Sequence, residues 1–270
     1  MAYGCYKIHD KNPNAKILVA PSDHLIIKEE DYLNAIRAAF SSCAHEDILI
    51  TLGIKPTRPD TGYGYIQATE ISLESNKDLL KVKTFTEKPN KELAEVFFES
   101  GDFSWNSGMF IWSSKSIVNS FKQNMFEIHD LFKDGFGIYC TDKEHDFIQE
   151  IYAQCVNISV DYAILEKADN VYVLPCDIGW TDLGTWGALY NQVEKDSKDN
   201  AIVGKSVKLY NSVKNIISNP TDKLIVIDGL EDYIVVNTSD ALLICKKDNE
   251  QKIKQFVTDL GSTKEYKKFI

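Results

Sequence analysis

Short apolar runs alternate with amphipathic stretches over the first two thirds of the chain. Continuous apolar runs predict buried strands, and apolar residues spaced three and four apart predict helices. The predicted strands cover residues 16–21, 48–54, 64–71, 79–86, 105–113 and 170–176. The predicted helices cover residues 29–44, 91–100, 115–134, 143–155 and 159–168. This alternation indicates an α/β domain, for which we expect a largely parallel sheet.

Two of the helices have an apolar face that we expect to pack on the core. These residues are Leu33, Ile36, Phe40 and Cys43 in the first helix, and Leu93, Ala94 and Phe97 in the second. Asn90 precedes the second helix and is a suitable N-cap, because its side-chain oxygen can accept from a free backbone N–H.

The pattern changes after about residue 196. A polar linker, KDSKDNA, leads into short β-rich segments around 202–210, 214–218, 223–228, 233–237 and 241–246. A closing helix over 249–260 carries Ile253, Phe256, Val257 and Leu260 on one face. We find no convincing internal repeat. The predicted domains are therefore 1–196 and a C-terminal β-rich region with a closing helix, 197–270.

Composition limits the functional classes. The 270 residues are 44% hydrophobic and 26% charged, which is typical of a soluble globular protein. The net charge of −10 argues against a nucleic-acid surface. No apolar run approaches the roughly 20 residues that cross a bilayer. The six cysteines are scattered, without a CxxC motif, and we interpret them as reduced thiols of a cytoplasmic protein.

Two aspartates stand far apart in sequence, each in a distinctive context. Asp23 lies in ILVAPSDH and Asp182 in DIGWTDLGTW. Two such carboxylates can form a cradle for Mg²⁺, which takes few protein ligands and keeps the remaining positions for water and substrate phosphates. The alternative is that both are turn residues that follow strands.

A loop with two glycines, TRPDTGYGYIQ, follows the second predicted strand. Gly62 and Gly64 allow backbone conformations that other residues avoid and let the main chain approach a ligand. A simple turn explains the same residues.

Two further motifs offer polar ligands. In TFTEKPN, Glu87 and Lys88 end a strand and should point in opposite directions, one toward sugar hydroxyls and one toward a phosphate. In WNSGMF, Asn106 can both donate and accept, and we place it at or beside a strand end. Gly108 marks either a close approach or a β-bulge. A solvated charge pair is the alternative for Glu87 and Lys88.

The segment SVDYAILEKA places Asp161 and Lys167 near the two ends of a short helix. Other chemistries lack support in the sequence. The histidines show no zinc-binding spacing, GxxxxGK[ST] is absent, and no GxSxG motif suggests nucleophilic catalysis.

The order of the motifs is more specific than any one of them. PSDH, TRPDTGYGYI, FTEKP, WNSGMFIW, SVDYAILEKA and GWTDLGTW follow one another over roughly residues 2–195. In this order they resemble the sugar-1-phosphate nucleotidylyltransferases, and within them the bacterial mannose-1-phosphate guanylyltransferases, or GDP-mannose pyrophosphorylases. The resemblance implies a Rossmann-like, glycosyltransferase-A-like mixed sheet flanked by helices, with a small C-terminal β-rich appendage and a terminal helix.

The resemblance also implies a reaction, in which GTP and α-D-mannose 1-phosphate give GDP-mannose and pyrophosphate. It assigns Mg²⁺ to Asp23 and Asp182, mannose hydroxyls to Glu87 and Asn106, and the sugar phosphate to Lys88. The further substrate-binding residues that we predict are Gly62, Gly64, Asp161 and Lys167. The attacking phosphate oxygen is already an anion, so catalysis would rest on alignment and charge neutralisation by the metal and lysine.

One feature departs from the family pattern. Family members begin with a strand and a glycine-rich loop that resembles GGxGxRLxP, and this chain has none. We therefore expect an N-terminally truncated domain that lacks its first strands and is catalytically weak or inactive by itself. The alternatives are another hexose 1-phosphate or NTP as substrate, or a non-catalytic sugar-nucleotide-binding subunit. We expect no nucleic-acid or membrane partner and leave a homodimer open.

Overall fold

The computed structural model describes residues 1–269, which form two compact units. The first unit is Met1–Trp180, and the second begins at Thr181. None of the helices within residues 1–269 is long and apolar enough to cross a membrane.

A six-stranded sheet forms the centre of the first unit, in the order β1-β6-β3-β7-β5-β4. The strands are β1 (Lys16–Val19), β3 (Leu49–Ile54), β4 (Tyr65–Ser72), β5 (Leu80–Thr86), β6 (Phe103–Ser113) and β7 (Val171–Cys176). A short strand, β2 (Leu25–Ile26), pairs with β8 (Trp180–Thr181) where the unit ends. Every residue of β3 is buried, as its continuous apolar run predicts.

The direction of the strands differs from our expectation. Among residues 1–269 the six-stranded sheet contains one parallel pair, β3 with β7, and its other pairs are antiparallel. The prediction of a largely parallel sheet was therefore wrong, whereas the mixed sheet implied by the family resemblance is observed. Apolar runs fix which segments are buried strands, but they carry no information about strand direction. The long strand β6 lies between β1 and β3 and runs antiparallel to both.

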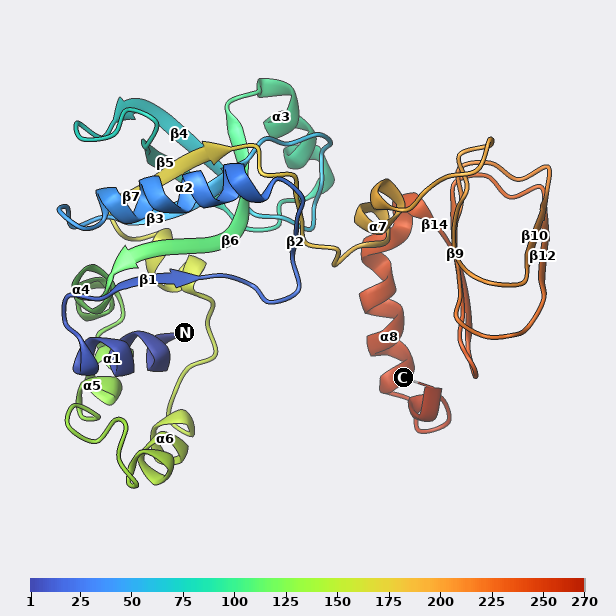
Figure 1. Cartoon of the computed structure of the whole chain (residues 1–270). Helices are drawn as coiled ribbons and strands as arrows, with labels where there is room; N and C mark the ends of the chain where they lie inside the picture. Colours follow the sequence, from blue (N-terminus) through green and yellow to red (C-terminus); the bar gives the residue numbers. More distant parts are fainter. Residues whose placement is uncertain (270) are drawn as a thin grey trace. The chain divides into compact units, whose positions relative to one another are not determined.

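Helices cover both faces of this sheet (Figure 1). Alternate residues of the central strands point to opposite faces, so Leu49 and Ile50 belong to two different clusters of the core. One face packs against α2 (Glu29–Ser42) and α3 (Lys91–Ser100). The other packs against α1 (Ala2–Lys11), α4 (Ser114–Asn124), α5 (Phe126–Lys133) and α6 (Glu144–Tyr152).

Helix α1 was not predicted. Its residues Cys5 and Tyr6 are buried and form part of the core. Two helix faces also differ from the prediction. Leu33 and Leu93 are exposed. The neighbouring alanines, Ala35 and Ala94 among them, are buried instead, because a helix packed closely on a sheet accommodates small side chains at the contact. Asn90 caps α3 as predicted and accepts a hydrogen bond from the Leu93 N–H at 2.9 Å.

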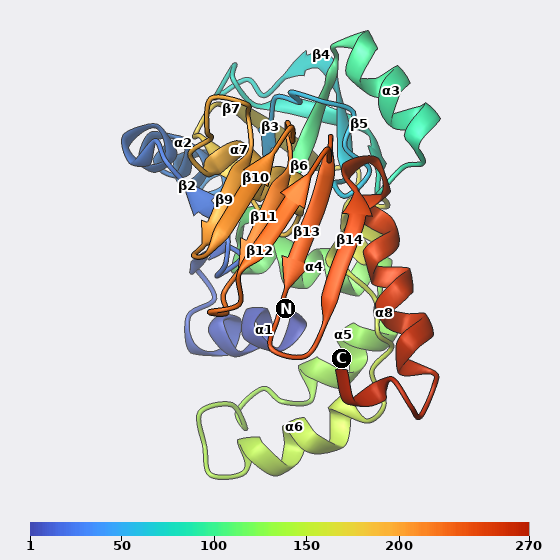
Figure 2. The ribbon, with the colours of Figure 1, turned by 90° about the vertical axis from the view of Figure 1, so that its right-hand side faces the viewer.

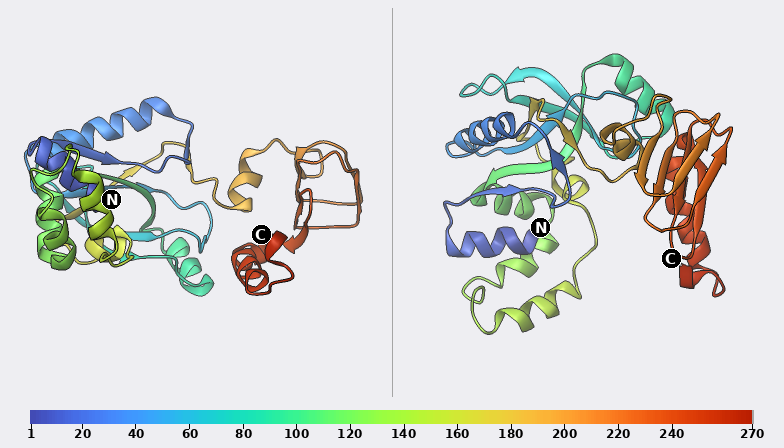
Figure 3. Two further views of the ribbon diagram at one scale, coloured as in Figure 1. Left: turned by 90° about the horizontal axis from the view of Figure 1, so that it is seen from below. Right: turned by 45° about the vertical axis from the view of Figure 1, so that its right-hand side comes forward.

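The second unit consists of stacked turns of chain (Figure 2), which Figure 3 shows from two further directions. Its strands are β9 (Ala201–Gly204), β10 (Val207–Tyr210), β11 (Ile216–Asn219), β12 (Ile225–Asp228), β13 (Tyr233–Asn237) and β14 (Leu242–Lys246). β9, β11 and β13 pair in parallel, as do β10 and β12, and β14 pairs antiparallel with β13.

A structural repeat underlies this stack, so our finding of no internal repeat was wrong. Asn219 and Asn237 lie 18 residues apart and hydrogen-bond to each other at 2.9 Å in the interior. Asn215 is fully buried and bonds to Asn200 in the same manner at 2.9 Å. The repeat rests on few positions, namely buried asparagines and β-branched residues, and the rest of each turn is free to vary.

The closing helix predicted over 249–260 is observed, but in two pieces, and a short 3₁₀-helix, η3 (Lys267–Phe269), follows it. A 3₁₀-helix, η2 (Lys247–Lys252), precedes α8 (Ile253–Gly261), and a helix α7 (Trp186–Gln192) begins the second unit. Ile253 and α7 pack on the buried cluster of Ala201, Ile216 and Ile234. The rest of the expected apolar face, Phe256, Val257 and Leu260, is exposed.

Candidate active site

Five predicted residues meet in the first unit, where β4, β5 and β6 adjoin. We call them the Asn106 cluster: Gly64, Glu87, Lys88, Asn106 and Asp161. The backbone N–H of Asn106 donates to the Gly64 carbonyl at 2.8 Å, and the Asn106 amide nitrogen donates to Asp161 Oδ1 at 3.0 Å. A Cβ atom added to Gly64 would lie 2.5 Å from Glu87 Oε2. These contacts bring together motifs that are far apart in sequence.

The backbone at Asn106 is an interruption within a strand. Asn106 lies inside β6 and not at or beside its end, so that prediction was wrong. The pairing of β6 with β3 shifts register between Thr51 and Gly53, and Gly108 has a φ of 71°. Of the two alternatives for Gly108 the β-bulge applies, because a Cβ there would lie at an ordinary contact distance of 3.5 Å from Pro21 Cγ. The irregularity turns the Asn106 side chain out of the regular sheet pattern.

The Asn106 side chain is almost fully used by the protein. Its Oδ1 accepts from Thr51 Oγ1 at 3.0 Å and from the Gly108 N–H at 3.2 Å. A backbone N–H can only donate, so the amide orientation is fixed and both lone pairs of Oδ1 are occupied. One Nδ2–H remains after the bond to Asp161. Asn106 can therefore only donate to a ligand, in contrast to the dual role that we expected.

The side chains of Glu87 and Lys88 turn toward each other, which contradicts their predicted divergence. Lys88 Nζ lies 2.6 Å from Glu87 Oε1. Strand β5 ends at Thr86, and Lys88 has a φ of 45°, so the alternation of a regular strand no longer applies. Glu87 is largely buried, whereas the Lys88 side chain is 57% exposed and can reach a ligand.

Negative charge is concentrated in the cluster. Burial raises the pKa of Asp161, and the charge of Glu87 raises it further. Burial together with the charges of Asp161 and Glu87 also raises the pKa of Glu166. The hydrogen bond from Lys88 to Glu87 raises the pKa of that lysine and keeps it cationic. Such a site favours ligands that donate hydrogen bonds, as hydroxyl groups do.

The predicted glycine loop adjoins the cluster, but neither of its glycines adopts a special conformation, and Gly64 is needed for space. Neither Gly62 nor Gly64 has a φ in the left-handed region, which corrects our interpretation. The Gly62 N–H donates to Asp60 Oδ1 at 2.8 Å. Asp60 in turn pairs with Arg58 at 2.6 Å. The contact of Gly64 with Glu87 leaves no room for a side chain.

The two aspartates lie on separate segments. Asp23 is exposed in the loop between β1 and β2, and Asp182 is half-buried and accepts from the Gly184 N–H at 3.1 Å. Asp182 follows Trp180 by two residues, and Trp180 Nε1 donates to His24 Nδ1 at 3.0 Å. Within residues 1–269 no three or more His, Cys, Asp or Glu side chains gather to hold a metal. Two carboxylates fit Mg²⁺, which prefers few protein ligands.

Lys167 does not join the Asn106 cluster. It lies beyond the single π-helical turn η1 (Asp161–Leu165), which replaces the predicted helix over 159–168. Its Nζ lies 3.7 Å from Met125 Sδ. Asp161 lies at the start of the same turn and bonds to Asn106. Of these two residues only Asp161 therefore belongs to the cluster.

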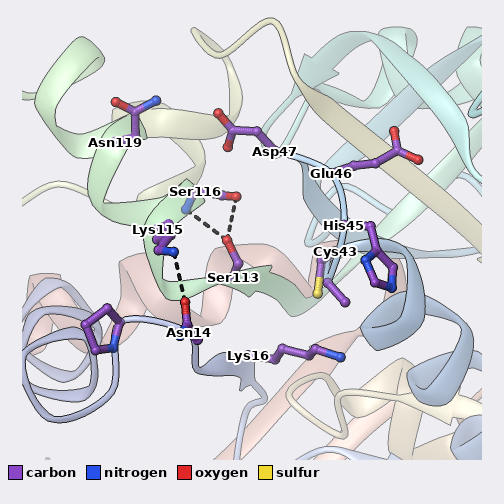
Figure 4. A pocket seen from close by; sticks show the side chains of 12 residues that line it. Asn14, Lys16, Cys43, His45, Glu46, Asp47, Ser113, Lys115, Ser116 and Asn119 are labelled. Carbon is purple, nitrogen blue, oxygen red and sulfur yellow. Dashed lines mark hydrogen bonds between the residues drawn. The ribbon is translucent and has the colours of Figure 1, made fainter.

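A cavity of about 420 Å³ lies elsewhere, beside the start of β1 and β3 (Figure 4). Its side chains carry both signs of charge, Lys16 and Lys115 against Glu46 and Asp47. The Lys115 ammonium is already bonded to Asn14 at 2.8 Å. None of the predicted site residues lines this cavity, so it is not part of the candidate site.

The family model described as nucleotidyl transferase matches residues 2–199. The chain belongs to the nucleotidyl transferase family. A second model, described as the MannoseP isomerase/GMP-like beta-helix domain, matches residues 204–260 of this nucleotidyl transferase. The domain boundary at 196/197 remains a prediction, because the compact units of the structure divide after Trp180.

Curated relatives resemble almost the whole chain. A mannose-1-phosphate guanylyltransferase of Escherichia coli is 34% identical over 273 residues, 97% of this chain and 56% of that protein. The xanthan biosynthesis protein XanB of Xanthomonas campestris pv. campestris is 34% identical over 91% of this chain and 51% of its own length. This nucleotidyl transferase thus spans about half the length of the curated relatives it matches.

A solved structure confirms the fold of this nucleotidyl transferase. The crystal structure of a mannose-1-phosphate geranyltransferase from Thermus thermophilus superposes with a TM-score of 0.81. It is 24% identical, and the match covers 96% of this chain and 73% of that one. The α/β nucleotidyltransferase fold with a β-rich C-terminal region is therefore observed. Members of this family generally use a divalent metal ion.

Three residues that hold the site of this nucleotidyl transferase were not predicted. Thr51 supplies the buried hydroxyl to Asn106, and Arg58 stacks 5.3 Å from the centre of the Trp105 ring while it pairs with Asp60. A threonine within the apolar run ILITLGI is the one signal that could have pointed to Thr51. Arg58 and Asp60 lie in a polar loop, where charged residues are common and do not by themselves indicate a functional site.

Proposed function

We propose that this nucleotidyl transferase transfers the guanylyl group of GTP to α-D-mannose 1-phosphate, which gives GDP-mannose and pyrophosphate. The observation that carries the proposal is the Asn106 cluster, in which four sugar-side motifs converge in one place. The similarity over almost the whole chain to proteins named mannose-1-phosphate guanylyltransferase supports the choice of substrates.

The cluster suggests a division of roles toward the sugar. Glu87 and Asp161 would accept from hydroxyl groups, because carboxylates are the acceptors that the cluster leaves available. The free N–H of Asn106 would donate to a hydroxyl oxygen. Gly64 lets the Glu87 carboxylate lie against the loop, and we propose that the main chain at Gly62 and Gly64 approaches the ligand. We assign Lys167 no role, since its contact is with Met125.

The sugar phosphate needs positive charge, and Lys88 is the proposed source. Its side chain is mostly exposed, so it can exchange part of its contact with Glu87 for a phosphate oxygen. A different oxygen of the same phosphate would attack the α-phosphorus of GTP. A new oxygen–phosphorus bond forms, the bond to the β-phosphate oxygen breaks, and pyrophosphate leaves. No general base is required, because the attacking oxygen is already an anion.

We propose that Asp23 and Asp182 hold Mg²⁺. Asp182 follows Trp180 by two residues, and each residue extends a chain by at most about 3.6 Å. Trp180 in turn contacts His24, the neighbour of Asp23. When bound, the metal would neutralise phosphate charge. A second bond supports the proposal: the Ile27 N–H, four residues after Asp23, donates at 3.3 Å to the carbonyl of Gly179, three residues before Asp182.

Pyrophosphate release tests the proposal directly. The chain is incubated with Mg²⁺ and each pairing of GTP, ATP, UTP or dTTP with mannose, glucose or galactose 1-phosphate. We expect weak release with GTP and mannose 1-phosphate, dependent on the metal. Preferential turnover of another pair would establish a different specificity. Binding of GDP-mannose without turnover of any pair would favour the non-catalytic subunit.

Substitution tests the metal site. Asp23→Asn and Asp182→Asn should each abolish most activity and raise the Mg²⁺ concentration needed for the remainder, because each removes one ligand charge. Asp130→Asn is the matched control, since Asp130 is an exposed carboxylate paired with Lys133. Unchanged magnesium dependence in the Asp182 variant would contradict the assignment.

The setting of the reaction is also a proposal. We place it in the cytoplasm, where the six cysteines would stay reduced as they are in the structure. The names of relatives involved in alginate and xanthan biosynthesis suggest that the GDP-mannose supplies polysaccharide biosynthesis. Light scattering of the purified chain would show whether it forms a homodimer.

A further inference from the structure

The contact between His24 and Trp180 fixes the state of the histidine ring. Trp180 Nε1 lies 3.0 Å from His24 Nδ1. An indole N–H can only donate, so Nδ1 must be the acceptor and carries no proton. The proton of the neutral imidazole is then on Nε2. Geometry thus selects one of the two tautomers.

Packing also fixes the orientation of this ring. The His24 and Trp180 rings meet edge to face, with centroids 5.3 Å apart and planes at 78°. On its other side, His24 Cε1 lies 3.9 Å from the position of a Cβ at Gly108. Trp180 is itself held against Tyr63, with centroids 5.3 Å apart. A flip or a swing of the imidazole would therefore break its hydrogen bond and its ring contact with Trp180.

The placement of the ring is informative. His24 directly follows Asp23, and its Cε1 lies 3.9 Å from the position that a Cβ at Gly108 would take. The Gly108 N–H donates to Asn106 Oδ1. The ring therefore stands between the proposed metal carboxylate and the residue proposed to meet the sugar. If the sugar of a sugar 1-phosphate lies at Asn106 and the metal at Asp23, the phosphate lies between them, beside the His24 ring.

The Nε2–H of His24 has no partner in the part of the chain that the structure describes. Its one hydrogen bond within residues 1–269 is the bond to Trp180 through Nδ1. The ring is half-buried, so Nε2 is a directed donor that remains available to a ligand. Phosphate oxygens accept such bonds well, and an uncharged donor does not compete with a cation held by the adjacent Asp23.

We propose that His24 binds the phosphate of the sugar phosphate through its Nε2–H, and that Trp180 is a positioning residue that holds His24 in this tautomer. This inference takes the identity of its ligand, a sugar phosphate, from the proposed function. The geometry of the ring, in contrast, does not depend on that function.

The tautomer can be measured without any activity. Long-range ¹H–¹⁵N spectra of the full chain should show His24 with an unprotonated Nδ1 and a protonated Nε2. In Trp180→Phe, which keeps an aromatic ring but removes the donor, both tautomers should appear. If His24 of the wild-type protein carries its proton on Nδ1, the inference is wrong.

Binding of mannose 1-phosphate tests the role of Nε2–H. The amide nitrogen of glutamine is as many bonds from Cα as Nε2 is, and that of asparagine as many as Nδ1. His24→Gln should therefore retain the dissociation constant within about threefold, whereas His24→Asn should weaken it roughly tenfold to a hundredfold, the range for a hydrogen bond to a charged group. Trp180→Phe should lie between them. Retained melting temperatures confirm that the variants are folded.

The outcomes separate this inference from the proposed function. Equal affinities in His24→Gln and His24→Asn would overturn the role of His24, even if the wild-type protein makes GDP-mannose. A clear difference between these variants would support it, even if no GDP-mannose is formed and the proposed reaction fails. Absence of mannose 1-phosphate binding by the wild-type protein would overturn both.

Discussion

Replacement of Gly64 by alanine should disable the sugar side of the site while the fold survives. The added Cβ would lie 2.5 Å from Glu87 Oε2, far inside van der Waals contact. Its next neighbours, Asn106 Cβ at 3.4 Å and Phe85 Cε1 at 3.5 Å, are at tolerable distances. The Glu87 carboxylate is thus the group that must move. Gly64 has no positive φ, so the backbone accepts alanine without strain.

The size of the effect follows from what Glu87 loses. Movement of the end of a flexible side chain should cost about 1 kcal/mol of stability, at the low end for overpacking. A displaced carboxylate can no longer accept from a sugar hydroxyl. A hydrogen bond to a charged group contributes about 1.5–3 kcal/mol. At about 1.36 kcal/mol for each factor of ten, this corresponds to a roughly 10- to 150-fold loss in kcat/KM.

Steady-state kinetics with mannose 1-phosphate varied at saturating GTP would measure this loss, and calorimetric binding of GDP-mannose would measure it independently. The KM for GTP should not change. Gly4→Ala is the matched control, because a Cβ at Gly4 meets no atom within 4 Å. If Gly64→Ala binds GDP-mannose as tightly as the wild-type protein does, Glu87 does not hold the sugar.

Three further predictions concern the support of the site and the second unit. Because burial raises the pKa of Asp161, the stability that its protonated carboxyl contributes is fully present below the unfolded pKa of about 4 and is lost as the pH rises through the folded pKa; the melting temperature of Asp161→Asn should therefore rise relative to that of the wild-type protein as the pH increases above about 4. Arg58→Lys keeps the charge but loses the planar stack on Trp105, so denaturant titration should show a loss of about 1 kcal/mol together with a raised KM for mannose 1-phosphate. Asn215→Ala removes the side-chain oxygen that accepts from the Tyr233 N–H at 2.9 Å and leaves that donor without its partner, so it should lower the unfolding free energy of the second unit by about 2 kcal/mol in calorimetry.

The secondary structure was largely predictable because burial and local spacing determine it. The run over 48–54 is apolar throughout apart from Thr51, and β3 is buried throughout. Strand direction was not predictable, since β6 would show the same apolar run whether it lay parallel or antiparallel to β3. Helix α1 was not predictable for another reason: it has 10 residues, and only Cys5 and Tyr6 are buried, so its apolar pattern is too short to indicate a helix.

The membership of the Asn106 cluster was largely predictable, but its geometry was not. Motif order brought Glu87, Asn106 and Asp161 into consideration. Lys167 belongs to the same motif as Asp161 and was predicted with it, yet a single π-turn separates the two side chains. The left-handed backbone at Lys88 reverses the expected divergence from Glu87. Such local departures from regular geometry depend on tertiary contacts that no short pattern contains.

The hydrogen-bonding capacity of the cluster suggests how specificity arises. Both acceptor positions of Asn106 are taken by Thr51 and Gly108, so the acceptors left for a ligand are the carboxylates of Glu87 and Asp161. The donors available to a ligand are the Lys88 ammonium, the second Nδ2–H of Asn106 and the His24 Nε2–H, and we propose that Lys88 and His24 meet the phosphate. A ligand must therefore present hydroxyl donors at one end and an anionic acceptor at the other. A sugar epimer that moves one hydroxyl away from these carboxylates loses a hydrogen bond to a charged group, which costs more than a lost neutral contact. Discrimination among hexose 1-phosphates should thus depend on the carboxylates, and Glu87→Gln should reduce selectivity more than Lys88→Arg does.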